Sequence, residues 1–237
     1  MTTLTIAVPP AANPATPTSP YRTAADLDRL RADLGDVPPE RIRLTPPPGT
    51  ATEDDCVRTV ESKTGGLVEL VAGTLVEKPV GYREAMLAAE IVFHIQQFVR
   101  TNRLGIVLPP DGMHRMTQGN VREPDVSFTA WGDMPGRQLP DGKVFPSSPT
   151  LAIEVLSESN TAKEMRAKRQ EYFGSITKLV WQVDLETRTI DVFANPADSD
   201  AFTRLTVADT LDGGAALPGF TLPVAEVFAV LDRGPQG

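Results

Sequence analysis

The chain has 237 residues, of which 41% are hydrophobic and 23% are charged, enough apolar side chains for one sizeable globular core. Asp and Glu outnumber Lys and Arg by 31 to 23, and the resulting net charge of −8 argues against a protein that coats nucleic acid non-specifically. No apolar run approaches the ~20 residues that span a bilayer, and a lone cysteine, Cys56, rules out an internal disulfide framework and a cysteine-cluster zinc site. Since the N-terminus lacks the basic start and apolar run of a secretory signal, we expect a cytoplasmic protein.

Proline marks the first boundary, because ten of the 22 prolines fall within the first 50 residues. Residues 1–20 are rich in Ala, Pro and Thr without periodicity, which predicts a disordered tail whose removal leaves the thermal midpoint nearly unchanged. Residues 21–65 are predicted to form an N-terminal helical extension. It contains a helix from Ala24 to Leu34, capped by Thr23, and a short helix that Thr52 opens.

Residues 66–232 have the pattern of one α/β domain. The strongest predicted helix spans 83–100 and has an apolar stripe that begins at Leu87. Glu84 lies one turn before Leu87 on the same face. A second helix is predicted at about 161–173. Strands are predicted at 67–71, 74–77, 106–108, 113–116, 126–128, 151–156, 179–183 and 189–193. The first two form a hairpin, and the order of the remaining elements indicates a mixed β-sheet flanked by helices.

A single carboxylate, Glu154, interrupts the apolar strand from Leu151 to Leu156. Ionised carboxylates are almost never fully buried unless they are paired or bound to metal. A solvent-facing Glu154 would also expose Leu156, so the pattern favours a functional carboxylate.

A second carboxylate, Asp125, follows Pro124 at the start of another apolar strand. The Pro-Asp dipeptide is common in turns, and by itself it favours a structural role. Together with Glu154 on an adjacent strand, however, Asp125 would form an oxygen-ligand site of the type that Mg²⁺ prefers. A cation there can activate a water and neutralise charge on a scissile phosphate.

The following helix supplies positive charge. Lys168 lies one turn after Glu164, and the sequence leaves open whether the two form a solvated ion pair or Lys168 serves the site. Residues 160–180 and 100–122 each carry a net charge of +3, which favours a focused phosphate-binding cleft. On this helix we expect Lys163 and Arg169 to face solvent or the cleft rim.

Two further features have structural and functional alternatives. The Pro- and Gly-rich stretch of residues 131–149 either flanks the cleft or is decoration. Tyr172 and Trp181 fall in apolar, periodic contexts, so we expect core residues rather than base-stacking platforms.

Five segments, in this order, resemble the Uma-type restriction endonuclease family of bacteria, within the PD-(D/E)XK nuclease superfamily: Leu70–Glu77, Pro124–Phe128, Leu151–Ser157, Glu164–Tyr172 and Leu179–Asp184. The resemblance covers roughly Leu67 to Ala229. It implies a restriction-endonuclease-like core, a mixed β-sheet flanked by helices, with the N-terminal helical extension outside it.

The resemblance also implies site residues. Asp125 matches the PD aspartate and Glu154 matches the acidic residue of the second motif. Leu156 replaces the usual lysine, and Lys168 matches the position from which the following helix supplies it. Glu84 stands where many members carry histidine, and a third metal-facing group and a simple helix N-terminal carboxylate are equal alternatives for it.

We therefore hypothesise a Mg²⁺-dependent endonuclease that hydrolyses DNA, with Mn²⁺ as an alternative cofactor and RNA as an alternative substrate. Asp125 and Glu154 would hold the metal, Lys168 would stabilise the attacking hydroxide or the developing phosphate charge, and Glu84 would orient water or a second ion. A homodimer is the expected assembly, and no membrane partner is expected. The competing hypothesis is a catalytically silent nuclease-like fold that binds DNA or protein, which the acidic net charge motivates.

Overall fold

The computed structural model describes residues 18–79 and 81–232 of the chain. Apart from its last residues, the predicted tail at 1–20 lies outside the described residues. Within them, Ser19 Oγ donates a hydrogen bond of 2.7 Å to the carbonyl oxygen of Pro48. The boundaries at residues 20 and 65 stay predictions. No helix in the described parts of the chain is both long and apolar enough to cross a membrane.

The main sheet has six strands in the order β10-β9-β8-β7-β6-β3, and only β7 and β8 run parallel to each other. The strands are β3 (Gly105–Leu108), β6 (Val126–Ala130), β7 (Leu151–Leu156), β8 (Leu179–Asp184), β9 (Thr189–Phe193) and β10 (Thr203–Leu205). This is the mixed sheet predicted from the sequence, and five of these strands begin or end within two residues of the predicted positions.

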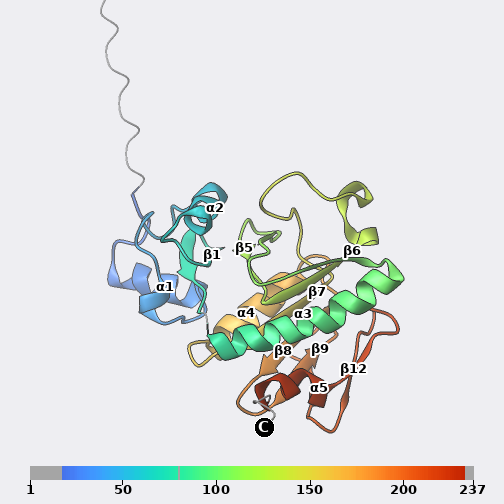
Figure 1. Cartoon of the computed structure of the whole chain (residues 1–237). Coiled ribbons are helices and arrows are strands. Elements are labelled where there is room, and N and C mark those ends of the chain that lie inside the picture. Colours follow the sequence, from blue (N-terminus) through green and yellow to red (C-terminus); the bar gives the residue numbers. More distant parts are fainter. Residues whose placement is uncertain (1–17, 80, 233–237) are drawn as a thin grey trace, which may run out of the picture.

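Helices cover both faces of this sheet (Figure 1). Helix α3 (Tyr82–Asn102), which has 21 residues, packs Leu87 and Ile91 against Ile153 of β7. The short C-terminal helix α5 (Val224–Phe228) belongs to the same hydrophobic cluster. Ala152 of β7 belongs instead to a cluster with residues of α4 (Ala162–Phe173). Since side chains alternate along a strand, Glu154 points to the same face as Ala152, toward α4.

A second, smaller sheet lies beside the first, in the order β2-β1-β5-β4. Its strands are β1 (Val68–Val71), β2 (Thr74–Glu77), β4 (His114–Arg115) and β5 (Val121–Arg122). The hairpin of β1 and β2 was predicted, but its separation from the main sheet was not. Helix α2 (Glu53–Glu61) packs Cys56 against this sheet, and α1 (Ala24–Asp33) packs Leu30 against Val71.

Capping residues begin α1 and α2 where the sequence indicated, and a third threonine begins α4. Thr23, Thr52 and Thr161 each accept a hydrogen bond from the third residue of their helix, whose carboxylate bonds back to the cap. Gly35 ends α1 with a φ of 75° and lies so close to α4 that a Cβ there would come within 2.6 Å of Glu164 Cα. Helix α1 therefore approaches the start of α4 as closely as only a glycine allows.

The C-terminal elements were not predicted. β11 (Thr210–Asp212) and β12 (Thr221–Pro223) pair with each other and lead into α5, whose Phe228 joins the core under α3. These strands have three residues each, too few to show a periodic pattern. Short 3₁₀ helices occur at Pro39–Arg41, Trp131–Asp133, Pro135–Arg137 and Ala229–Asp232.

Candidate active site

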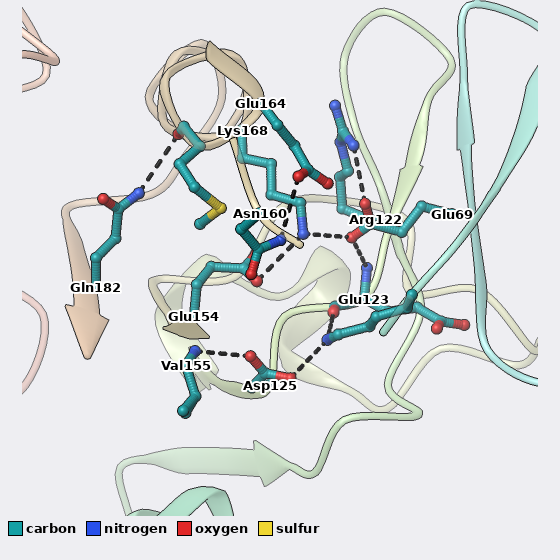
Figure 2. A network of polar contacts seen from close by, with 12 residues as sticks. Glu69, Arg122, Glu123, Asp125, Glu154, Val155, Asn160, Glu164, Lys168 and Gln182 are labelled. Carbon is teal, nitrogen blue, oxygen red and sulfur yellow. Dashed lines mark hydrogen bonds and ion pairs between the residues drawn. The ribbon is translucent and has the colours of Figure 1, made fainter. Parts of the chain in front are cut away.

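Asp125 and Glu154 lie opposite each other at one end of the antiparallel pair β6 and β7. Val126 pairs with Ile153 in the register of these strands, which places the preceding Asp125 beside Glu154. The backbone N–H of Val155 donates a 2.7 Å hydrogen bond to Asp125 Oδ2, as Figure 2 shows. Only 3% of Glu154 is exposed. The two carboxylates that the sequence singled out therefore occupy one place on the sheet.

Lys168 reaches this place from α4. Its Nζ lies 3.2 Å from Glu154 Oε2 and 3.0 Å from Glu69 Oε1, and only 2% of the residue is exposed (Figure 2). Burial by itself lowers the pKa of the ammonium, but the carboxylates of Glu154 and Glu69 outweigh that effect and raise it. The contact of Lys168 with Glu154 is direct.

The alternative of a solvated ion pair between Glu164 and Lys168 is wrong. Glu164 is buried and forms a two-pronged salt bridge with Arg41, at 2.9 Å from Nη1 and 2.7 Å from Nη2. Arginine prefers this fork geometry with carboxylates. Helix α4 thus uses Glu164 to bind the N-terminal extension and leaves Lys168 to the sheet.

Glu69 on β1 is a site residue that the sequence analysis missed. Besides Lys168, it accepts a 2.9 Å bond from Arg122 Nη1 and a 3.2 Å bond from the backbone N–H of Glu123. Burial raises the pKa of Glu69, but Lys168 and Arg122 outweigh burial and lower it overall. Arg122 is itself held by Glu171 of α4 at 2.7 and 2.8 Å. A carboxylate inside an apolar strand was the available signal, the same one that marked Glu154.

Tyr172 belongs to the core, as predicted, and also to the site. It is fully buried in the cluster between α4 and the sheet, and its O–H donates a 2.6 Å hydrogen bond to Glu154 Oε1. Both carboxylate oxygens of Glu154 are therefore held, one by Tyr172 and one by Lys168. Burial raises the pKa of Glu154, and the positive charge of Lys168 opposes that rise. Trp181 is a core residue, as predicted.

A second lysine, Lys78, was not predicted as part of the site. It follows β2 directly, and its Nζ lies 2.9 Å from Asp125 Oδ1 and also donates to the backbone carbonyl of Glu123. Only 6% of its side chain is exposed. Burial lowers the pKa of Lys78, but the carboxylates of Asp125 and Glu154 outweigh burial and raise it.

A cavity of about 20 Å³ lies among these groups, enough for one water or ion. Its polar lining consists of Lys78, Glu84, Asp125, Glu154, Ser157, Asn160 and Lys168. Glu84 comes from the first turn of α3 and also lines an adjoining groove of about 940 Å³. All four residues predicted for the site therefore line one cavity, with Glu84 at the side where the groove begins.

The groove is not the basic cleft that the local charges predicted. Its described lining has two arginines, Arg83 and Arg169, against six carboxylates: Glu84, Glu158, Asp184, Glu186, Asp191 and Asp200. Most of the basic side chains of the two segments are paired instead, as with Arg115 and Glu53, Lys163 and Asp36, or Lys178 and Asp133. The cleft prediction is wrong because counting charges along a segment ignores the partners that the fold brings to it.

The Pro- and Gly-rich stretch lies elsewhere. Residues 140–144 and Pro146 line a separate pocket of about 270 Å³ together with α2. None of the residues of this stretch lines the cavity or the groove, which speaks against the alternative that the stretch flanks the cleft.

A divalent cation at this site would take two carboxylate ligands from the protein and its other ligands from water or substrate. Across the described ranges, no three His, Cys, Asp or Glu side chains converge closely enough to hold a metal by themselves. The cavity offers carboxylate oxygens of Asp125 and Glu154 with room for one ion. Mg²⁺ typically keeps several waters and binds one or two carboxylates plus substrate phosphates, and this donor set suits that behaviour.

Comparison with known proteins gives a family match and matches among solved structures. The model of the Uma2 family, described as "Putative restriction endonuclease", matches residues 56–225. Among solved structures, a putative nuclease belonging to DUF820 from Anabaena variabilis ATCC 29413 shares the fold, with a TM-score of 0.64 and 18% identity over 76% of this chain and 98% of that chain. A search of curated proteins found no match.

Proposed function

Because the chain belongs to the Uma2 family of putative restriction endonucleases, we propose that it is a metal-dependent endonuclease that hydrolyses phosphodiester bonds in DNA. One observation carries the proposal: Asp125, Glu154 and Lys168, three groups far apart in the sequence, line one cavity of ion size at the edge of a groove. We further propose that the protein works as a homodimer in the cytoplasm.

Asp125 and Glu154 would hold Mg²⁺ or Mn²⁺. Such an ion would polarise an oxygen of the phosphate and lower the pKa of a bound water. The protein prepares both carboxylates in advance, since the Val155 N–H orients Asp125 and the Tyr172 hydroxyl orients Glu154. Fixed orientation of ligands by neighbouring groups is a general feature of metal sites.

Lys168 supplies a permanent positive charge beside the cavity, where negative charge develops on the phosphate during hydrolysis. Its raised pKa keeps the ammonium protonated at neutral pH, so it stabilises charge and does not act as a base. Glu84, at the groove side of the cavity, is placed to orient a water or a second ion.

The test is cleavage of plasmid DNA by the full chain with Mg²⁺, with Mn²⁺ and with EDTA. We expect nicking or linearisation that EDTA abolishes and that Asp125→Asn, Glu154→Gln and Lys168→Met each reduce by at least ~100-fold. Glu226→Gln removes an exposed carboxylate of α5 far along the chain and should cleave like the wild type. Activity in EDTA, or unchanged activity in the two carboxylate variants, would overturn the proposal. An RNA substrate, tested in parallel, shows whether the enzyme acts on DNA or on RNA.

A second candidate is a catalytically silent binding module. The observation that favours it is that both carboxylates proposed as metal ligands are already ion-paired, Asp125 with Lys78 and Glu154 with Lys168. Calorimetry separates the two: Mn²⁺ binding that Glu154→Gln abolishes supports the enzyme, whereas DNA binding without any metal binding supports the module.

A further inference from the structure

The ammonium of Lys78 lies against Asp125, in a position where a divalent cation bound to this carboxylate would be expected. It contacts an oxygen of Asp125, the first proposed metal ligand, at 2.9 Å, and its second partner is the backbone carbonyl of Glu123. A positive group held by a carboxylate and a carbonyl oxygen has the kind of ligands that Mg²⁺ takes. The side chain lines the same cavity as Glu154.

We propose that Lys78 is a built-in counter-ion of Asp125 that competes with the divalent cation, so that metal binding displaces the Lys78 ammonium toward the groove. This inference rests on the proposed function, because it assigns a role to Lys78 at the proposed metal site. It adds an autoinhibitory contact: without metal, Lys78 closes the position at Asp125.

The contrast with Lys168 explains why Lys78 is the residue that yields. Lys168 is held by two carboxylates, those of Glu69 and Glu154, whereas Lys78 contacts only Asp125 among the described carboxylates. A divalent ion beside Asp125 would repel both ammonium groups, and the one with fewer ionic partners costs less to move. The displaced ammonium would move toward the groove, because the next residue, Pro79, lines both the cavity and the acidic groove.

The experiment measures metal affinity directly. Mn²⁺ is titrated into the full-length wild type, Lys78→Met and Lys163→Met, and the bound ion is followed by electron paramagnetic resonance or calorimetry. Lys163→Met is the matched control, because it removes an exposed lysine whose partner is Asp36, away from the cavity. We expect Lys78→Met to bind Mn²⁺ about tenfold more tightly than the wild type, and Lys163→Met to match the wild type.

The outcomes separate this inference from the proposed function. Equal Mn²⁺ affinity of Lys78→Met and the wild type, with binding that Glu154→Gln abolishes, overturns the competition and leaves the metal-dependent enzyme intact. No Mn²⁺ binding by any variant overturns both.

A second measurement uses the unaltered protein and so does not depend on the folding of a variant. An amine-reactive reagent is applied with and without Mn²⁺, and the modified lysines are identified by peptide mass spectrometry. Lys78 should be modified several-fold faster with Mn²⁺, while the exposed Lys163 reacts at the same rate in both conditions. Equal modification of Lys78 in both conditions contradicts its displacement.

Discussion

At the scale of single residues, the site consists of charges that are buried in matched pairs. Glu154, Glu69 and Lys168 are each at most 3% exposed, and each contacts a group of opposite charge. Removing one member of such a set leaves an unpaired buried charge, which costs far more than the loss of a surface ion pair. The site residues are therefore also stability residues, and tests of function need variants that keep shape.

The first residue-scale prediction concerns Glu69. Glu69→Gln keeps the shape but removes the charge that holds Lys168 against the sheet, so we expect DNA cleavage to fall by ~10- to 100-fold, mainly through kcat. Glu77→Gln, on the neighbouring strand β2 and half exposed beside Arg43, is the control and should keep the wild-type rate. A Glu69→Gln enzyme with full activity and an unchanged thermal midpoint would show that Lys168 needs no second carboxylate.

The second residue-scale prediction uses Glu123, whose buried carboxylate oxygens have no hydrogen-bond partner among the described residues. Burial, reinforced by the charge of Glu69, raises the pKa of Glu123 from 4.5 to about 8. The folded state therefore holds a proton that the unfolded state has lost, so the free energy of unfolding falls by a few kcal/mol as the pH rises from about 4.5 to 8.

Glu123→Gln removes that loss. The variant should match the wild type in thermal midpoint near pH 4.5 and exceed it increasingly toward pH 8, in melts followed by circular dichroism. A constant difference between the two proteins across this range would contradict a raised pKa at Glu123.

At the scale of elements, α4 joins three parts of the molecule. Its Glu164 binds Arg41 of the N-terminal extension, its Glu171 binds Arg122 of the small sheet, and its Lys168 and Tyr172 bind Glu154 of the main sheet. Lys168 lies four residues after Glu164 and three and four residues before Glu171 and Tyr172, so these side chains lie on neighbouring faces of the helix. The extension thereby supports the helix that carries the site lysine.

The element-scale prediction tests this support. Arg41→Met leaves Glu164 buried without its cation and should lower the free energy of unfolding by ~3 kcal/mol, measured by urea denaturation. Arg29→Met, which breaks an exposed pair with Asp26, should change it by less than ~0.5 kcal/mol. Adding Glu164→Gln to Arg41→Met should restore part of the loss, and a double variant less stable than Arg41→Met would refute the ion-pair explanation.

At the scale of the whole molecule, charge opposes the proposed substrate. The chain has a net charge of −8. Six carboxylates and two arginines line the described part of the groove next to the cavity, and three of these carboxylates, Glu186, Asp191 and Asp200, form ion pairs with arginines. Nucleic acid is polyanionic, so its approach to this groove is unfavourable unless divalent cations neutralise part of the charge.

This leads to a prediction about binding in EDTA, measured by fluorescence anisotropy with a labelled duplex. Wild-type affinity should be weak, and Glu158→Lys, which reverses an exposed charge in the groove, should raise it several-fold and steepen its decline with salt. Glu226→Lys makes the same change on α5, outside the groove, and should have a clearly smaller effect. Equal effects of the two variants would mean that the duplex does not use the groove.

The sequence by itself determined most helices and strands up to β9, but not β10, β11, β12 or α5, and it singled out the carboxylates of Asp125 and Glu154. An apolar β-rich run predicted β7, a helical period predicted α3, threonine caps located α1 and α2, and a carboxylate inside an apolar strand pointed to Glu154. These are local features, and local physics is enough to show them. The position of Lys168 was inferred from a family resemblance, and the sequence alone left it balanced against a surface ion pair.

Only the tertiary structure decided which charges meet. Glu69 and Lys78 belong to a hairpin of the small sheet, and they reach Lys168 and Asp125 across distances of 99 and 47 positions in the chain that no local pattern records. The basic segments lost their excess charge to distant partners for the same reason. Burial makes these contacts strong. A carboxylate or ammonium that is removed from water must either form an ion pair or lose its charge by a change of protonation.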